Sequence, residues 1–243
     1  MTKTMIEATD IAMALGEGPG RVDALKGINL SLIGGELTLL MGPSGSGKTT
    51  LLSVLGCMLS PTGGTVQICG RSTTGLDSEQ LAELRRDNVG FVFQSYHLFP
   101  TLTAAENVRL ALDVRGEHSP LARVKAEKAL ATVGLSHKAN AFPRALSGGE
   151  QQRVAIARAI VGDASVILAD EPTAALDSEN GQAVMTVLAE IAKDPARAMF
   201  IVTHDPRIMP FADRILRIED GRIVSDQRRG ANLSAVRTLK YAS

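Results

Sequence analysis

The sequence predicts an α/β fold in which a parallel sheet carries helices on both faces. Three observations support this prediction. Short apolar runs alternate with segments of helical periodicity, glycine-rich turns separate the first strands, and 44% of the 243 residues are hydrophobic. A chain of this length can bury the core of one large domain, and its 21% of charged residues is typical of a globular protein.

The strands are expected where short apolar segments lie between turn residues. The expected strands cover residues 7–12, 28–32, 37–41, 65–69, 89–93, 166–169 and 199–202, with two short strands around Asp220-Gly221. The Gly-Pro-Gly stretch within residues 16–20 is expected to be a loop.

The helices are expected mainly in the second half of the chain. The segment 104–133 is expected to be mainly helical, and a second helix opens at Ser147. A third helix carries apolar residues at i, i+3, i+4 and i+7, namely Val184, Val187, Leu188 and Ile191. Residues from about 95 to 160 therefore resemble a helical insertion into the alternating pattern. We expect one domain over residues 1–226, followed by a basic tail, 227–243.

The tail contains basic residues and no acid after Asp226, namely Arg228, Arg229, Arg237 and Lys240. Such a segment could touch anionic lipid, because basic residues are attracted to that surface. A solvated chain terminus is the favoured interpretation.

Composition restricts the classes of partner. Lys plus Arg and Asp plus Glu each total 26, so no global basic field favours DNA or lipid. Cys57 and Cys69 lack the spacing of a metal site or redox pair, and we expect both in the core of a protein from a reducing compartment. No apolar run approaches the roughly 20 residues of a spanning helix, so a membrane role would require a partner.

A glycine-rich loop follows the apolar segment 37–41 and matches G-x-x-x-x-G-K-[ST] between a strand and a helix. Its glycines allow backbone N–H groups to point at phosphate oxygens, and the dipole of the following helix adds to the attraction. Lys48 is expected to reach the β and γ phosphates of a nucleotide, and Thr49 to bind Mg²⁺. The loop consists of Gly42, Pro43, Ser44, Gly45, Ser46, Gly47, Lys48, Thr49 and Thr50. A glycine-rich turn without a ligand is the alternative, which the preceding strand disfavours.

Two acids, Asp170 and Glu171, end the apolar segment 166–169. Ligands of open α/β sheets collect at this end of the strands. We expect Asp170 to hold the Mg²⁺ shell through water and Glu171 to accept a proton from the attacking water. A solvated turn would explain the two acids equally well on their own, but the phosphate loop in the same chain favours a site.

The second helix opens with the sequence LSGGEQQR, from Leu146 to Arg153. Ser147 is a suitable N-cap, and the two glycines after it expose N–H groups at the positive end of the helix dipole. With this motif the chain resembles the ABC family of nucleotide-binding domains over roughly residues 5–226. In that family the signature of one subunit closes over the γ phosphate held by the phosphate loop of the other. The corresponding residues here are Ser147, Gly148, Gly149 and Glu150.

The resemblance assigns roles to three further residues. Gln94 resembles the glutamine that contacts Mg²⁺ and the attacking water, and His204 resembles the switch histidine that contacts the γ phosphate. Asp177 ends the stretch 175–177, which resembles the segment that crosses the dimer seam. The expected catalytic residues are Glu171, His204, Gln94 and Lys48, and the expected metal ligands are Thr49, Gln94 and Asp170.

The family implies a P-loop ATP hydrolase with a mixed sheet core, a helical insertion and an antiparallel β edge. The resemblance also implies a homodimer that encloses two MgATP and drives an integral membrane permease at the cytoplasmic face of the inner membrane. The strings GPSGSGKTTLL, FVFQSYHLFPTLTAAENV and EPTAALDS are most similar to ATPases of lipoprotein-releasing and macrolide-exporting permeases, which implies a periplasmic adaptor. The stretch with Tyr96, Leu98, Phe99 and Pro100 would lie near a groove for a permease helix, or would simply pack in the core.

Two other functions stay open. The chain resembles equally an ATPase that regulates a cell-division permease without transport, and the permease encoded beside it would separate the two. ATPases of DNA repair and chromosome organisation share the nucleotide sandwich. They insert coiled coils or zinc modules before the signature, and this interval holds neither. We therefore expect no nucleic-acid partner, and copurification with a membrane protein rather than with DNA would decide the point.

One position departs from the family. ABC domains usually place an aromatic residue that stacks on adenine at the end of the first strand, and here the position holds Leu15, with no aromatic residue before Phe91. Arg21 could lay its guanidinium plane on the base, although a solvated loop arginine is the favoured reading. We therefore expect weak discrimination between bases.

Overall fold

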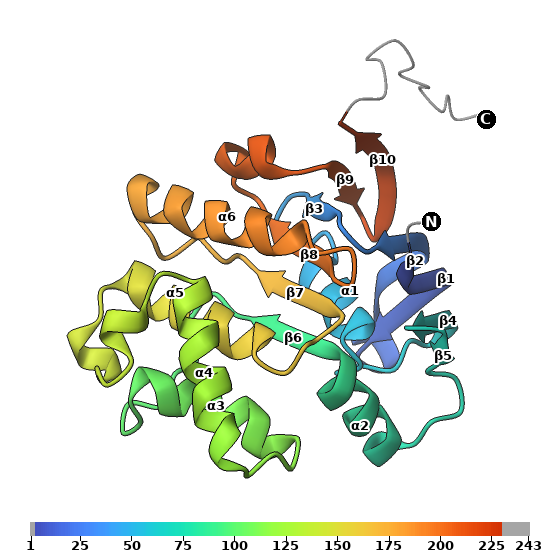
Figure 1. Ribbon diagram of the computed structural model, residues 1–243. Helices are drawn as coiled ribbons and strands as arrows, with labels where there is room; N and C mark the ends of the chain where they lie inside the picture. The colour runs from blue at the N-terminus through green and yellow to red at the C-terminus, as the bar shows by residue number, and fades with distance from the viewer. Residues whose placement is uncertain (1–2, 230–243) are drawn as a thin grey trace.

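The computed structural model describes residues 3–229, which form two sheets with helices around them (Figure 1). One sheet has six strands in the order β10-β9-β3-β8-β7-β6, and the other has four in the order β2-β1-β4-β5. The strands are β1 (Thr4–Leu15), β2 (Val22–Ile33), β3 (Leu37–Met41), β4 (Gly63–Ile68), β5 (Arg71–Ser72), β6 (Val89–Val92), β7 (Val166–Asp170), β8 (Ala198–Thr203), β9 (Arg214–Glu219) and β10 (Arg222–Arg228).

Six α-helices are present among these residues. They are α1 (Lys48–Leu55), α2 (Ser78–Asn88), α3 (Ala104–Val114), α4 (Pro120–Thr132), α5 (Gly148–Ile160) and α6 (Ser178–Ala192). Short 3₁₀ turns lie at Gly18–Gly20, Ser136–Lys138, Pro143–Ala145 and Pro206–Phe211. No helix among residues 3–229 is both long and apolar enough to cross a membrane.

The six-stranded sheet is mixed, as the family resemblance implied. Strands β6, β7, β8, β3 and β9 pair in parallel, and β10 forms an antiparallel edge with β9. Strands β3 and β8 are buried along their whole length, and β7 is buried up to its last residue. Helices cover both faces of this sheet, which is why these strands read as uninterrupted apolar runs.

Each face of the six-stranded sheet has its own hydrophobic core. Successive residues of a strand point to opposite faces, so Leu39 belongs to one core and Leu40 to the other. Helix α1 packs in the core shared with the antiparallel sheet, whereas α3, α4, α5 and α6 pack in the core on the other face (Figure 1). Helices α1 and α5 therefore lie on opposite faces of the sheet.

The first part of the chain does not join the single sheet that the alternating pattern predicts. Strands β1, β2 and β4 form a separate antiparallel sheet, and β1 and β2 are 12 residues each, longer than expected. The connection between β1 and β2 is too short for a parallel crossover, so the two strands must pair as antiparallel neighbours. The expected loop at 16–20 contains a 3₁₀ turn.

The helical insertion is divided, and a helix was missed before it. Gly116, at φ +79°, and Pro120, in the first turn of α4, separate α3 from α4 within the expected segment 104–133. Helix α2 is not among the predicted elements, although Asp77 and Gln80 form a reciprocal capping box at its start. The expected strand 89–93 ends one residue earlier, at Val92.

The two cysteines occupy different environments. Cys57 is buried as expected, and burial raises the pKa of its thiol to about 11. Cys69 is only half-buried and packs against the edge of the core, so its expected burial is only partly met. It lies at φ +50° in the tight turn between β4 and β5.

Strand β10 continues to Arg228, past the expected start of the tail at residue 227. Arg228 lies 3.4 Å from the carboxylate of Glu36, and the backbone N–H of Arg229 donates to the carbonyl of Asp213 at 2.7 Å. These two basic residues are therefore bound to the domain. Arg237 and Lys240 lie outside the described residues.

Candidate functional site

The phosphate loop lies between β3 and α1 and is packed tightly against two other strands. Gly47 caps α1 at φ +101°, a conformation that favours glycine. A Cβ at Gly47 would lie 2.6 Å from the carbonyl oxygen of Ala24 in β2, and one at Gly42 would lie 2.2 Å from that of Ile218 in β9. Side chains at these two positions would push the loop away from its support.

Several donor groups of this loop have no partner among the described residues. The backbone N–H groups of Gly45, Gly47, Lys48 and Thr49 form no hydrogen bond within residues 3–229, and they lie at the positive end of the α1 dipole. The buried hydroxyl of Ser46 likewise has no partner in the described part of the chain. The Nζ of Lys48 adds a positive charge beside them. The loop thus fits the terminal phosphates of a nucleotide.

Asp170 ends β7 half-buried beside the phosphate loop. Burial raises the pKa of its carboxyl, and the neighbouring charge of Glu171 raises it further, while Lys48 and a hydrogen bond with the hydroxyl of Thr49 oppose the shift. A carboxylate and a hydroxyl placed together are oxygen ligands of the kind that Mg²⁺ prefers. Gln94 is exposed, and its side chain forms no hydrogen bond within residues 3–229, so the structure does not join it to this pair.

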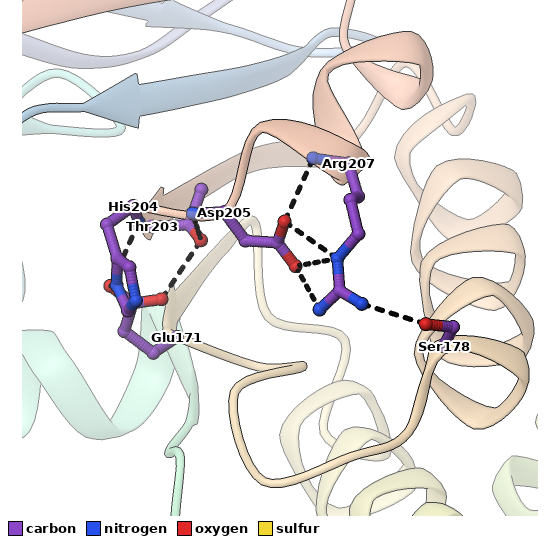
Figure 2. A network of polar contacts seen from close by, with 6 residues as sticks. All are labelled: Glu171, Ser178, Thr203, His204, Asp205 and Arg207. Carbon is purple, nitrogen blue, oxygen red and sulfur yellow. Dashed lines mark hydrogen bonds and ion pairs between the residues drawn. The ribbon is translucent and has the colours of Figure 1, made fainter.

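Glu171 and His204 are brought together by the order of the strands. Strands β7 and β8 are parallel neighbours with Asp170 opposite Val202, which places the residues after each strand side by side. The Oε1 of Glu171 accepts the backbone N–H of His204 at 3.0 Å and lies 2.6 Å from its Nδ1, while Oε2 accepts the hydroxyl of Thr203 at 2.9 Å (Figure 2). Both carboxylate oxygens are therefore held in place, with only 13% of the Glu171 side chain exposed.

The signature forms the first turn of α5. Ser147 is the N-cap, its hydroxyl accepts the N–H of Glu150 at 3.2 Å, and the Glu150 carboxylate accepts the N–H of Ser147 at 2.8 Å. This backbone hydrogen bond lowers the pKa of Glu150, and Lys138 at 3.6 Å lowers it further. The predicted N-cap is confirmed, and Glu150 is bound to its own helix.

The start of α5 is packed against two neighbouring segments. A Cβ at Gly148 would lie 3.0 Å from the Tyr96 hydroxyl, and one at Gly149 would lie 2.5 Å from the Asn180 side chain in α6. Asp177 is the N-cap of α6 and accepts hydrogen bonds from the backbone and side-chain nitrogens of Asn180, which lower its pKa. No hydrogen bond among residues 3–229 joins the signature to the phosphate loop.

Comparison with known proteins decides the family. Residues 25–174, more than half of the chain, match the family described as ABC transporter. The chain belongs to the ABC transporter family. It is accordingly an ATPase domain of that family, and the P-loop resemblance seen in the sequence is confirmed.

Relatives of this ABC domain include larger proteins. The macrolide export ATP-binding/permease protein MacB of Shigella flexneri is 43% identical over 220 residues, which is 90% of this chain and 34% of the relative. MacB of Marinobacter nauticus is 44% identical over 224 residues, 92% of this chain and 35% of the relative. The chain thus spans about a third of the length of the curated relatives it matches.

A solved structure agrees with the ABC fold. The ATP-binding cassette MJ0796, in a dimeric post-hydrolysis state bound to ADP and Pi, superposes with a TM-score of 0.83 at 41% identity. The match covers 93% of this chain and 100% of that one.

The end of the β1–β2 hairpin, where Leu15 was expected to meet adenine, is aliphatic. Leu15 ends β1 with 39% of its surface exposed, and it pairs in register with Val22, which is 62% exposed. Gly47 packs on Ala24, so this end of the hairpin adjoins the phosphate loop. Arg21 lies 3.7 Å from Asp23, which gives its guanidinium an acidic partner within the loop region.

Sequence reasoning missed several polar residues near Glu171. Thr203 contacts the carboxylate directly, and Asp205, Arg207 and Ser178 continue the same network (Figure 2). The available signal was the triplet Thr-His-Asp at the end of a buried strand, where polar residues are otherwise rare.

Proposed function

We propose that two copies of this ABC ATPase enclose two MgATP and drive motion in a membrane permease. The observation that carries the proposal is the separation of the two phosphate-binding helix ends. Helix α1 and helix α5 belong to cores on opposite faces of the six-stranded sheet. A nucleotide that needs both ends must therefore receive the second from another chain. The solved cassette described as a dimer supports this arrangement.

The site residues take the following roles in the proposal. The loop N–H groups and Lys48 bind the β and γ phosphates, and Ser147 of a second chain approaches the γ phosphate from the other side. Thr49 and Asp170, with Gln94, would hold Mg²⁺, which neutralises charge on the phosphates when bound.

Proton transfer falls to Glu171 in this proposal. Its carboxylate accepts the proton of the attacking water, and Thr203 and His204 fix its orientation through three contacts. His204, whose ring is exposed, would also contact the γ phosphate in this proposal. Because both carboxylate oxygens are already positioned, the side chain needs little reorganisation before it acts.

The partner is proposed to be an integral membrane permease of the export type, at the cytoplasmic face of the inner membrane, acting with a periplasmic adaptor. The relatives named for macrolide export are described as ATP-binding/permease proteins, and this chain covers about a third of their length. The stretch after Gln94 offers an apolar contact, since Phe99 is 51% exposed while Leu98 packs on the helical core. No nucleic acid is involved.

The dependence of turnover on protein concentration tests the two-chain site. We expect the ATPase rate per chain to rise with concentration until the dimer is saturated, because a lone chain has only half of each site. Steady-state ATPase assays over a dilution series measure the rate, and light scattering with MgATP measures the mass. A constant rate per chain from a species that remains monomeric would contradict the proposal.

Leu15→Tyr is expected to tighten the apparent affinity for ATP about tenfold, because aromatic stacking contributes about 1–3 kcal/mol per base in nucleic-acid-binding proteins. In the wild type the phosphate contacts supply most of the affinity, so GTP should be hydrolysed at a rate comparable to ATP. Competition between ATP and GTP on both proteins measures the effect, with Leu15→Met as the aliphatic control. Strong ATP preference in the wild type, without gain from tyrosine, would contradict it.

A further inference from the structure

Arg207 connects two parts of the site that lie far apart in the sequence. Its guanidinium binds both carboxylate oxygens of Asp205 at 2.8–3.0 Å, and its remaining nitrogen donates to the hydroxyl of Ser178 at 2.8 Å (Figure 2). Ser178 is the first residue of α6 and directly follows Asp177. One side chain thus joins the loop after His204 to the start of α6.

The connection continues to the carboxylate of Glu171. The backbone N–H of Asp205 donates to the hydroxyl oxygen of Thr203 at 3.0 Å, and that hydroxyl donates to Oε2 of Glu171 at 2.9 Å. Hydrogen bonds therefore link Ser178 through Arg207 to the carboxylate of Asp205, and the backbone N–H of the same Asp205 is linked through Thr203 to Glu171 (Figure 2).

The chemistry of the central pair suits a positioning role. Asp205 is 14% exposed, and the hydrogen bonds from the Arg207 side chain lower its pKa, while the same bonds raise the pKa of Arg207. Arg207 itself is 61% exposed, and ion pairs with an exposed partner add little to stability. A planar guanidinium can bind a carboxylate with two nitrogens and still offer a third, which an ammonium cannot do with fixed geometry.

We propose that Arg207 is a positioning residue for hydrolysis. It couples the position of residues 175–177 to the position of the loop that orients Glu171. The inference rests on the proposed two-chain function, in which these residues lie at the seam between chains. Residues 175–177 lead directly into Ser178, so a partner chain that fixes them also fixes the hydroxyl that Arg207 holds. Closure of the two chains would then stabilise the orientation that Glu171 already has in the single chain.

Steady-state kinetics of Arg207→Gln and Ser178→Ala, singly and together, test this role in the full chain. Arg207→Gln should lower kcat about tenfold, because small displacements of a catalytic group are costly, while KM for ATP stays within about twofold. Ser178→Ala should cause a smaller loss, and the double variant should be no worse than Arg207→Gln, since both changes break one connection. Arg207→Lys keeps the charge and should recover only part of kcat.

Lys193→Gln is the matched control, because it breaks an exposed ion pair with Glu190 at the other end of α6 and should leave kcat unchanged. An unchanged kcat in Arg207→Gln would overturn the inference, and so would additive losses of kcat in the double variant. A loss of kcat that is fully explained by a lower Tm of the variant would overturn it as well. The proposed function fails on a different result, namely a wild type that is fully active as a monomer.

Discussion

Glu171→Gln is expected to lower ATP turnover about 100-fold or more while leaving ATP binding intact. The amide has the shape of the carboxylate and can still accept the hydroxyl of Thr203, but it cannot accept the proton of the attacking water. Because the bound nucleotide then persists, the two chains should remain associated. Turnover is measured by phosphate release, ATP binding by equilibrium titration, and association by light scattering at saturating MgATP.

The matched control for this variant is Glu179→Gln, which makes the same change at an exposed position in the first turn of α6. Its turnover should equal that of the wild type. Near-normal turnover of Glu171→Gln would remove this residue from the role of base. A Glu171→Gln protein that stays monomeric with saturating MgATP would instead count against the nucleotide-bound dimer.

Ser147→Arg is expected to abolish hydrolysis while the ATP affinity of the single chain barely changes. The exposed Ser147 side chain caps α5, which packs on the opposite face of the sheet from α1, so a bulky cation there should block only the approach of a second chain. Loss of the cap itself costs about 1 kcal/mol, and Ser147→Ala isolates that contribution. Ser119→Arg makes the same change at the N-cap of α4 and should retain activity.

Mixing two inactive variants gives the sharpest form of this test. A dimer of one Ser147→Arg chain and one Glu171→Gln chain contains one site with an intact base facing an intact signature. Excess Ser147→Arg chain added to Glu171→Gln chain should therefore restore measurable turnover. Wild-type activity of Ser147→Arg alone, or no recovery in a mixture that associates, would contradict catalysis by two chains.

The strands that carry the site could be predicted because of their burial. Leu37–Met41 and Val166–Asp170 are covered on both faces, so they appear in the sequence as apolar runs. Recognising these runs also gives the positions of the site residues that follow them. The partners of those residues could not be predicted in this way. The contact of Glu171 with His204 follows from β7 and β8 being neighbours in register, and local sequence does not specify strand order.

Missed and misplaced elements have equally specific causes. Helix α2 buries little besides Leu84, so it lacks the apolar stripe on which a helix prediction depends. The division between α3 and α4 depends on the positive φ of Gly116, within a segment whose residues otherwise favour a helix. The separate antiparallel sheet also requires pairing between β1 and the distant β4, which no single stretch of sequence reveals.

Lys48 has a second duty that follows from its hydrogen bonds. Its Nζ donates to the carbonyl oxygens of Gly42 at 2.9 Å and Pro43 at 2.7 Å, so two of its three N–H groups fasten the beginning of the phosphate loop to the helix that ends it. The third remains for an oxygen outside the loop. One ammonium group thus both rigidifies the phosphate loop and attracts the phosphate. Replacing Lys48 by a neutral residue would therefore loosen the loop as well as remove the positive charge.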